Sequence, residues 1–416
     1  MIKKNFIIYS TLALIAHSTQ AIAPYGFLQP YNFVIQPDIQ DKTVQIIGLF
    51  EQAFNTRSYD VDGNLVNPLQ MYESKQDALA LFQGFDTDSQ FAQLLNSFAM
   101  GPGSSLSADA GLYSVTGDVK ARAEAIGLSW KISHGFSVRA YLPLYQIELK
   151  NVDWIYSGGV DDIFSDAVMQ QELLSSFAQD AKNLFDLSID GWKVSGVGDL
   201  ALMVQWQANF PQYRKALNNV QPRIRFGIEI PTGKKVNENV IAMPAFGNDG
   251  ALAFPFGAEL NLQAFRHLEF KVNAQFWYIL GNTKNRRIKS FENQTTLLLP
   301  SVVSAYKEHG FVQNFNLGLK INLTHGLFAR ALYDYERKSE DIIFVSKNGA
   351  LSSIVATQKS LDETTHHYAM LSVGFDGAMY ERLTTKPQIH FFVRIPFNGS
   401  AATCASTVGA QLSLEF

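Results

Sequence analysis

The sequence predicts an all-β protein, a closed antiparallel transmembrane β-barrel of about 12 strands with short helices in long outer loops. Three observations predict it. Apolar and polar side chains alternate over stretches of about 9 to 13 residues, the length that a tilted strand needs to cross a bilayer. The connections between these stretches alternate between short and long. The chain also ends in an alternating stretch whose last residue, Phe416, lies on the apolar face.

Composition excludes several classes of protein. Charged residues make up 17% of the chain and the formal net charge is -4, so we expect no nucleic-acid partner. Cys404 is the single cysteine, which excludes an intrachain disulfide and a thiolate metal cluster. No stretch after the N-terminus is apolar for long enough to form a membrane-spanning helix. We expect neither a metal nor a cofactor.

The N-terminus has the pattern of a secretory signal peptide. Two lysines precede an apolar run over residues 6–16, and Ala21 and Ala23 are small residues of the type that signal peptidase requires. We therefore interpret residues 1–23 as a signal peptide that is cleaved after Ala21 or after Ala23. No cysteine lies near either position, which argues against a lipoprotein anchor.

The exported part of the chain divides into two regions. Residues 24–43 are predicted to form a periplasmic leader or a small hatch inside the barrel. Residues 44–416 are predicted to form the barrel itself, which places the protein in the cell outer membrane with lipid around it.

The strand pattern is clear in residues 221–231. Ile224 and Phe226 share one face, whereas Arg223 and Arg225 share the other. A soluble β-sandwich also alternates, but its strands average only about 5 to 6 residues. By this criterion the chain has strands at about 44–57, 117–132, 135–149, 198–210, 221–231, 252–265, 268–281, 311–323, 326–338, 367–378, 387–397 and 405–416.

The first strand leaves its orientation open. Both of its faces carry apolar side chains, so either could face lipid, and a β-bulge in this region is compatible with the pattern. The two competing sets are Gly48, Phe50 and Phe54 against Ile47, Leu49 and Ala53.

The connections alternate between tight turns and long loops. Tight turns are expected at 133–135, 266–267 and 324–326, where His with Gly or Arg supplies the turn. The long connections are 58–116, 150–197, 232–251, 282–310 and 339–366. Bacterial barrels have short periplasmic turns, long outer loops and an even strand count, so both ends of this barrel are predicted to lie in the periplasm.

The closing stretch explains why the chain can end in mid-strand. In a barrel the last strand pairs with the first, so its edge is not exposed. A terminal alternating strand that ends in Phe resembles the assembly signal of Gram-negative outer-membrane proteins. The resemblance implies recognition by the barrel-assembly machinery through Val408, Ala410, Leu412, Leu414 and Phe416.

A second resemblance is local. Gly196, Gly198 and Asp199 open one predicted strand, and Pro231-Thr232-Gly233 end the next. These two motifs resemble those of outer-membrane barrels named for the phenol-degradation meta pathway, which are channel-like relatives of hydrophobic-compound transporters. The alternative is that both motifs are ordinary hairpin sequences.

Charged residues occupy the face opposite to lipid. They would either line an aqueous path or form paired networks that fill a closed barrel, and the sequence leaves both possibilities open. The predicted lumen-lining residues are Arg139, Arg223, Arg225, Glu229, Glu259, Glu269, Lys271, Lys320, Arg330, Asp334 and Arg394, with Glu336 on the same face.

The long loops contain apolar periodic stretches at 74–85, 91–98 and 166–185, which predict short helices at the outer mouth. These helices would cap the mouth, or else form an apolar vestibule that plugs the barrel or collects apolar solutes. Ser372 near His366 and His367 is the best candidate for catalysis, but no nucleophile motif surrounds it. We therefore expect no enzymatic activity.

The predicted function is passive passage of small solutes, porin-like or similar to hydrophobic-compound channels. The alternative is a surface-exposed structural or adhesion barrel without an open pore. The sequence does not define the solute, the open or plugged state of the pore, or the oligomeric state.

Overall fold

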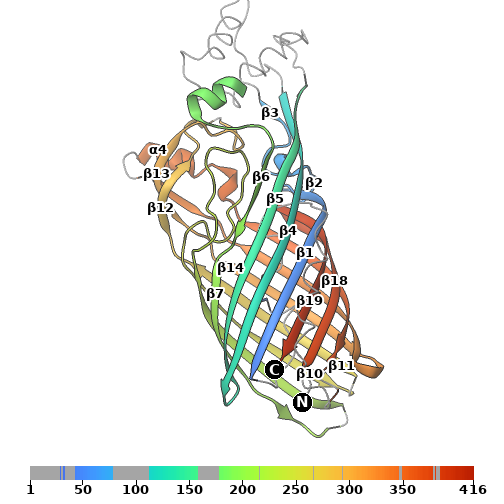
Figure 1. Cartoon of the computed structure of the whole chain (residues 1–416). Coiled ribbons are helices and arrows are strands. Elements are labelled where there is room, and N and C mark those ends of the chain that lie inside the picture. Colours follow the sequence, from blue (N-terminus) through green and yellow to red (C-terminus); the bar gives the residue numbers. More distant parts are fainter. Residues whose placement is uncertain are drawn as a thin grey trace, which may run out of the picture.

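The computed structural model describes residues 29, 31–32, 43–77, 112–157, 178–214, 216–265, 267–292, 294–345, 349–377, 380 and 385–416. In these residues, 12 antiparallel strands form a closed barrel (Figure 1). The barrel is closed because β1 pairs with β19, the last strand, and also with β4, the next strand along the wall. The predicted all-β barrel is therefore confirmed.

The barrel strands follow one another around the wall in chain order. They are β1 (Val44–Tyr59), β4 (Leu112–Ser133), β5 (Phe136–Ser157), β7 (Leu200–Gln207), β9 (Leu217–Ile230), β10 (Ala253–Ala264), β11 (Leu268–Ile279), β14 (Val312–Asn322), β15 (Leu327–Lys338), β17 (Thr364–Asp376), β18 (Lys386–Ser400) and β19 (Ala402–Glu415).

Shorter elements lie at the ends of these strands and in the loops. β12 (Asn282–Arg287), β13 (Val302–Glu308) and β16 (Ile342–Val345) form a separate three-stranded sheet that the sequence did not predict. The helical elements are η2 (Pro68–Gln70), η3 (Thr324–Gly326), α4 (Gly349–Val355), η4 (Lys359–Leu361) and residues 178–185. The remaining strands are β2 (Leu65–Val66), β3 (Gln76–Asp77), β6 (Trp192–Val197) and β8 (Phe210–Pro211).

We call the two rims of the barrel the turn end and the loop end. β12, β13 and α4 lie beyond the loop end, and the C-terminus lies at the turn end (Figure 1). β1 also begins at the turn end, because the Phe416 amide donates to the Val44 carbonyl at 2.9 Å. Among the described residues, no helix is long and apolar enough to cross a membrane.

The tight turns use left-handed backbone conformations. In the β4–β5 turn, His134 has φ 50° and Gly135 has φ 84°. In η3, between β14 and β15, His325 has φ 58° and Gly326 has φ 75°. Glycine adopts this conformation without strain, whereas the two histidines adopt it at some cost in free energy.

The expected strict alternation of short and long connections is wrong at one place. β18 and β19 are joined at the loop end by Ala401 alone, which has φ 48°. The Ala401 amide donates to the Asp60 carbonyl at 2.9 Å, so the end of β1 supports this turn in place of a long loop.

The structure resolves the orientation of β1. Ile47, Leu49 and Ala53 are buried, whereas Phe54 is exposed on the outer face together with Gly48. The register with β19 shifts between Phe54 and Arg57, so the bulge considered from the sequence is present.

β6 lies at the end of the predicted loop 150–197, and it precedes β7, which occupies most of the predicted strand 198–210. β5 pairs with β6 on the loop-end side of Pro143 and with β7 on the turn-end side. Two residues separate β6 from β7. Pro143 has no amide hydrogen to donate to a neighbouring strand, which explains the break. Its carbonyl still accepts a bond from the Gly198 amide at 2.8 Å.

The loop helices are confirmed only in part. Residues 178–185 are helical, as expected for the end of the stretch 166–185. Gln76 and Asp77 pair with β4 as β3, so no helix begins at residue 74. The rest of the predicted stretches 74–85, 91–98 and 166–185 lies outside the described residues, as do residues 1–28.

Candidate functional site

The predicted lumen residues have buried side chains, whereas the apolar residues next to them in sequence are exposed. On β9, Arg225 is 2% exposed and Phe226 is 57% exposed. Because exposed apolar side chains cover the outside of the closed barrel, the buried set lies on its inner wall. The buried set comprises Arg139, Arg223, Arg225, Glu229, Glu259, Glu269, Lys271, Lys320, Arg330, Asp334 and Arg394, while Glu336 is half-buried.

Many of these charges interact with one another across strands. Glu259 lies 3.4 Å from Arg223 Nη1 and 3.9 Å from Lys271 Nζ. Lys320 Nζ lies 3.4 Å from Glu269. Such pairs offset the cost of burying each charge, and they reduce the net field inside the barrel.

Glu51 on β1 is an inner-wall residue that the sequence analysis missed. Its carboxylate lies 3.4 Å from Arg394 Nη1 and accepts a bond from Thr407 Oγ1 at 2.5 Å. The Arg394 guanidinium in turn lies 4.1 Å from the centre of the Tyr368 ring. Glu51 shares its face with the apolar Leu49 and Ala53, which is why alternation alone did not place it inside.

Tyr31 lies inside the barrel and contacts residues that are far from it in sequence. Its hydroxyl donates to Glu229, and the Trp277 indole nitrogen donates to that hydroxyl at 2.9 Å. Arg225 donates to the Tyr31 carbonyl. Tyr31 is 2% exposed, and its ring centroid lies 6.0 Å from that of Tyr141. This tyrosine therefore bridges three strands of the inner wall: β5, β9 and β11.

The two local motifs meet in space. Asp199 accepts bonds from the Gly233 amide at 2.8 Å and from the Asn248 amide at 2.7 Å. Thr232 Oγ1 donates to the Gly198 carbonyl at 2.9 Å and accepts a bond from the Leu200 amide at 3.0 Å. The motifs thus fasten both ends of the connection 231–252 to the start of β7.

This fastening turns the connection toward the lumen. Phe246 is fully buried, and its ring centroid lies 5.6 Å from that of Tyr145 on β5. Asn248 Nδ2 donates to Glu229 at 2.6 Å, beside Tyr31. Gly247 has φ 141°, and a Cβ there would collide with the Asp199 carboxylate, so the close approach requires glycine.

The polarity of the wall reverses toward the loop end. On the lower part of β4 the outer face is apolar, with Ile126 61% exposed and Leu128 51% exposed. Further up the strand, Arg122 and Glu124 form an ion pair on the outer face, whereas Ala121 and Ala123 are buried inside. The outer face there suits water or lipid headgroups, and the interior near the loop end is apolar.

A cavity of about 330 Å³ lies in this apolar region, and we call it the outer cavity. It is bounded by β4, β5, β6 and β19, by η2, and by the connections that follow β9 and β12. Apolar side chains dominate its lining. They include Leu69, Val119, Ile147, Leu149, Trp192, Met243 and Leu297.

Two smaller cavities, each of about 30 Å³, lie around the Glu229 site. Gln29, Glu229 and Asn248 line both, and Tyr31 lines one of them. The interior at this level is therefore narrow, because Tyr31 and the connection after β9 fill it.

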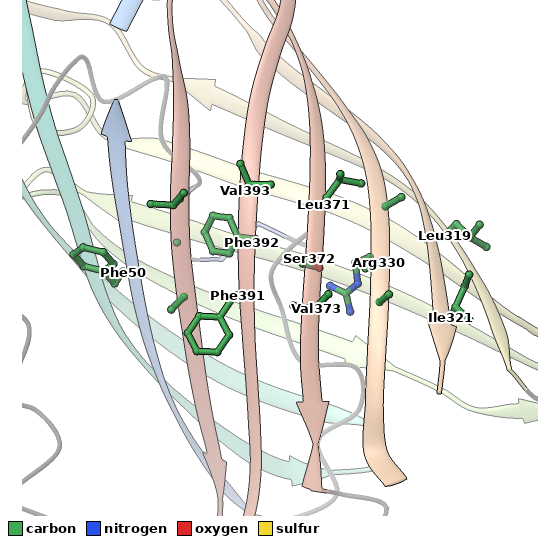
Figure 2. A pocket seen from close by; sticks show the side chains of 15 residues that line it. Phe50, Leu319, Ile321, Arg330, Leu371, Ser372, Val373, Phe391, Phe392 and Val393 are labelled. Atoms are coloured by element: carbon green, nitrogen blue, oxygen red, sulfur yellow. The ribbon is translucent and has the colours of Figure 1, made fainter. Parts of the chain in front are cut away.

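A groove of about 750 Å³ lies on the outside of the barrel (Figure 2). Its exposed lining residues include Leu371, Val373 and Phe391. Beneath it, the pairing of Ser372 with Arg330 and Phe392 is continuous. This groove therefore belongs to the lipid-facing surface and is separated from the lumen by an unbroken wall.

Beyond the loop end, an ionic cluster joins the three-stranded sheet to the barrel. Asp341 lies 2.6 Å from both Lys307 Nζ and Lys338 Nζ, and it accepts the Gly310 amide at 2.8 Å. Burial alone would raise the pKa of Asp341, but the two ammonium groups bring it below its usual value. Burial and the nearby Lys307 lower the pKa of His309 to about 4, so this imidazole is neutral at pH 7.

The residues considered for catalysis do not form a site. On β17, His366 and Ser372 are buried on the inner wall, whereas His367 is on the opposite face, where its Nδ1 lies 2.8 Å from the Tyr333 hydroxyl. His366 and Ser372 are six positions apart on one strand, which separates them by about 20 Å. Neither histidine can therefore act as the base for this serine.

The residues of the proposed assembly signal alternate on β19 as expected for a lipid-facing strand. Val408, Leu412 and Phe416 are 44%, 41% and 47% exposed. Ala410 and Leu414, on the same face, are half-buried, and Glu415, between Leu414 and Phe416, is buried.

Solved structures share this architecture. An outer membrane channel from Pseudomonas putida F1 aligns over 93% of this chain and 99% of its own, with 8% sequence identity and a TM-score of 0.51. This chain has the fold of an outer-membrane barrel. The likeness shows the fold alone, because so few residues are identical. No protein family model matches the sequence, and no curated protein matches it either.

Two other barrels are similar to a smaller degree. A FadL homologue from Pseudomonas aeruginosa aligns over 90% of this chain and 88% of its own, with 10% identity and a TM-score of 0.29. Outer membrane phospholipase A from Escherichia coli aligns over 92% of this chain and 93% of its own, with 9% identity and a TM-score of 0.29. At these scores neither likeness bears on the activity of this chain.

Proposed function

We propose that this outer-membrane barrel allows passive passage of small solutes that have an apolar body. The observation that carries the proposal is the outer cavity, which lies within the loop end of the barrel and has an apolar lining. Its volume of about 330 Å³ falls at the lower end of the range for small-molecule sites, about 300–1,000 Å³. Such a cavity would take a molecule the size of a substituted benzene.

Below the cavity, the solute would pass between the inner-wall residues listed above, which we propose line the path. Tyr31 and Asn248 obstruct that path at the level of Glu229. We propose that residues 24–43 act as a hatch and that passage requires Tyr31 to leave its site. The three strands that Tyr31 contacts support this role, since its side chain touches a residue on each of them.

Uptake by cells tests the proposal. A Gram-negative host that produces the protein should take up a labelled small aromatic hydrocarbon faster than the same host with an empty vector. Uptake of a sugar of similar size should not differ, because the apolar cavity offers a sugar few hydrogen-bond partners. Equal hydrocarbon uptake in the two strains would count against passage.

The alternative, a sealed barrel whose outer loops serve structure or adhesion, is favoured by the charge pairs of the inner wall. A network such as that of Glu51, Arg394 and Thr407 fills space inside the barrel. Planar-bilayer recordings separate the two candidates. A sealed barrel would remain non-conducting even after Tyr31 is truncated.

We also propose a role in export for residues 1–23 and a role in assembly for β19. Residues 1–23 would direct export as a signal peptide, and β19 would be recognised by the barrel-assembly machinery. The exposed apolar face of β19, from Val408 to Phe416, supports this second role.

A further inference from the structure

The outer cavity is not uniformly apolar, since several polar side chains also line it. Most of them already have a partner. Trp192 Nε1 donates to the Ile241 carbonyl at 2.7 Å, and Thr403 Oγ1 lies 3.1 Å from Ser58 Oγ. Ser360 Oγ accepts a bond from Gln358 Nε2 at 2.6 Å. These groups therefore have no need of a bound solute.

Thr296 is different. Its side chain lines the cavity, the residue is 6% exposed, and its hydroxyl has no hydrogen-bond partner among the described residues. The backbone is held in place, because the Thr296 amide donates to Glu73 Oε2 at 2.9 Å. A buried hydroxyl without a partner is uncommon in a folded protein, since it has lost its bonds to water and gained nothing in return.

Tyr72 also has no side-chain partner among the described residues, but it is half-buried. It lines the same cavity, and its only hydrogen bond within the described part of the chain is made by its backbone carbonyl, which accepts from Lys359 Nζ at 3.2 Å. Burial raises the pKa of its hydroxyl, and the carboxylates of Asp341 and Asp362 raise it further. The phenol is therefore a neutral donor in a region of low polarity.

We infer that the outer cavity selects solutes that carry one hydrogen-bonding group on an apolar body, and that Thr296 and Tyr72 are the residues that recognise this group. The inference rests on the proposed function and names the chemical class of its solute. The apolar lining would hold the body of the molecule, while a carbonyl or hydroxyl oxygen would accept a bond from one or both hydroxyls. A pure hydrocarbon would fill the same space and leave the buried Thr296 hydroxyl unpaired.

A matched pair of probes tests the inference. Acetophenone and isopropylbenzene have similar size and shape, and only acetophenone has an oxygen that accepts a hydrogen bond. Binding would be measured by equilibrium dialysis of the full chain in lipid nanodiscs, with empty nanodiscs as the blank for partitioning into lipid. Thr296→Val and Tyr72→Phe each remove a hydroxyl and keep the shape of the side chain.

We expect each substitution to weaken acetophenone binding by about tenfold and to leave isopropylbenzene binding unchanged or slightly tighter. Thr295→Val is the matched control. The Thr295 hydroxyl is also buried without a partner in the described chain, but Thr295 is not among the residues that line the cavity. This variant should bind both probes as the wild type does. Tyr72→Phe keeps the test valid if Thr296→Val fails to refold.

The possible outcomes separate the two proposals. If the wild type binds neither probe, the outer cavity is not a solute site and the proposed function fails with the inference. If the wild type binds both probes and neither substitution changes their ratio, the selectivity inference is overturned and the proposed function stands. An equal loss of acetophenone binding in Thr295→Val would also overturn the inference, because the effect would not come from the cavity.

Discussion

Asp199 and Asn248 lie 49 residues apart in the chain, and the Asn248 amide donates to Asp199 Oδ2 at 2.7 Å. The same carboxylate accepts the Gly233 amide, so it holds both ends of the connection that enters the lumen. This geometry gives the local motifs a physical role: they fix where the connection after β9 lies. The position of this connection and the other contacts of the inner wall have measurable consequences.

Asp199→Ala should loosen the connection 231–252. The Gly233 and Asn248 amides lose a charged acceptor, which costs about 2–4 kcal/mol, so we expect faster hydrogen exchange over residues 233–248 with little change in β9 or β10. Asp153→Ala, at an exposed position on β5, serves as the control and should exchange as the wild type does. Unchanged exchange in the connection would show that Asp199 does not hold it.

Tyr31→Ala should open the interior at the level of Glu229. The substitution removes the ring that contacts Tyr141 and Trp277, so we expect single-channel conductance in planar bilayers to rise several-fold above that of the wild type. Tyr213→Ala is a suitable control, because Tyr213 is 94% exposed. If the variant and the wild type conduct equally, Tyr31 is not the obstruction.

Glu51→Gln should destabilise the barrel more than the double variant Glu51→Gln/Arg394→Met. The single change removes the carboxylate that lies 3.4 Å from Nη1 of the buried Arg394, with an expected loss of about 3 kcal/mol in the free energy of unfolding. The double change removes the buried charge as well and should recover part of that loss. Urea unfolding of the refolded protein measures both values, and strict additivity would argue against coupling.

The three-stranded sheet beyond the loop end should weaken as the pH falls from about 6.5 to 4. Because the pKa of His309 is lowered to about 4 in the folded state, the unfolded chain binds a proton first, and the folded sheet loses stability through this interval. The shift corresponds to a loss on the order of 3 kcal/mol at most.

Hydrogen exchange over 302–308 and 342–345, corrected for the intrinsic effect of pH, measures this loss. In His309→Gln the pH dependence should be much smaller, because that side chain does not titrate. A steep dependence that persists in the variant would assign it to other groups. Asp341 is not expected to contribute in this interval, because its pKa lies below its usual value and its stabilising effect is lost only at lower pH.

Phe416→Ser should reduce the amount of folded barrel in the outer membrane of producing cells without reducing the stability of protein refolded in vitro by more than about 1 kcal/mol. Phe416 is 47% exposed on the outer face and therefore contributes little packing inside the molecule. Heat-modifiable gel mobility of membrane fractions measures the assembled amount. Equal amounts of the variant and the wild type would argue against recognition of this residue during assembly.

The strands could be predicted from the sequence because alternation is a local property. Residues 221–231 and 268–281 alternate cleanly, and β9 and β11 occupy most of these ranges. β6 was missed, because residues 192–197 were assigned to the long loop 150–197, and its separation from β7 depends on Pro143 in the neighbouring strand. The sequence around Gly198 does not show that its amide will donate to the Pro143 carbonyl.

The apolar interior near the loop end could not be predicted from alternation. A period of two shows that the faces of a strand differ, but it does not show which face meets lipid. Toward the loop end of β4, the apolar residues Ala121 and Ala123 point inward, whereas the apolar residues nearer the turn end of the same strand point outward. Tyr31 was missed for another reason, because it is 198 residues from Glu229 and 246 from Trp277 in sequence, and no local pattern records such contacts.

The halves of β4 and β5 nearer the loop end pair with each other and carry polar residues on the outer face. A cysteine introduced at Glu148, on that face, would carry a fluorophore in water. The native thiol at Cys404 is 2% exposed and would react slowly with the dye reagent. A single fluorophore attached in this way would report from the wall of the barrel on living cells.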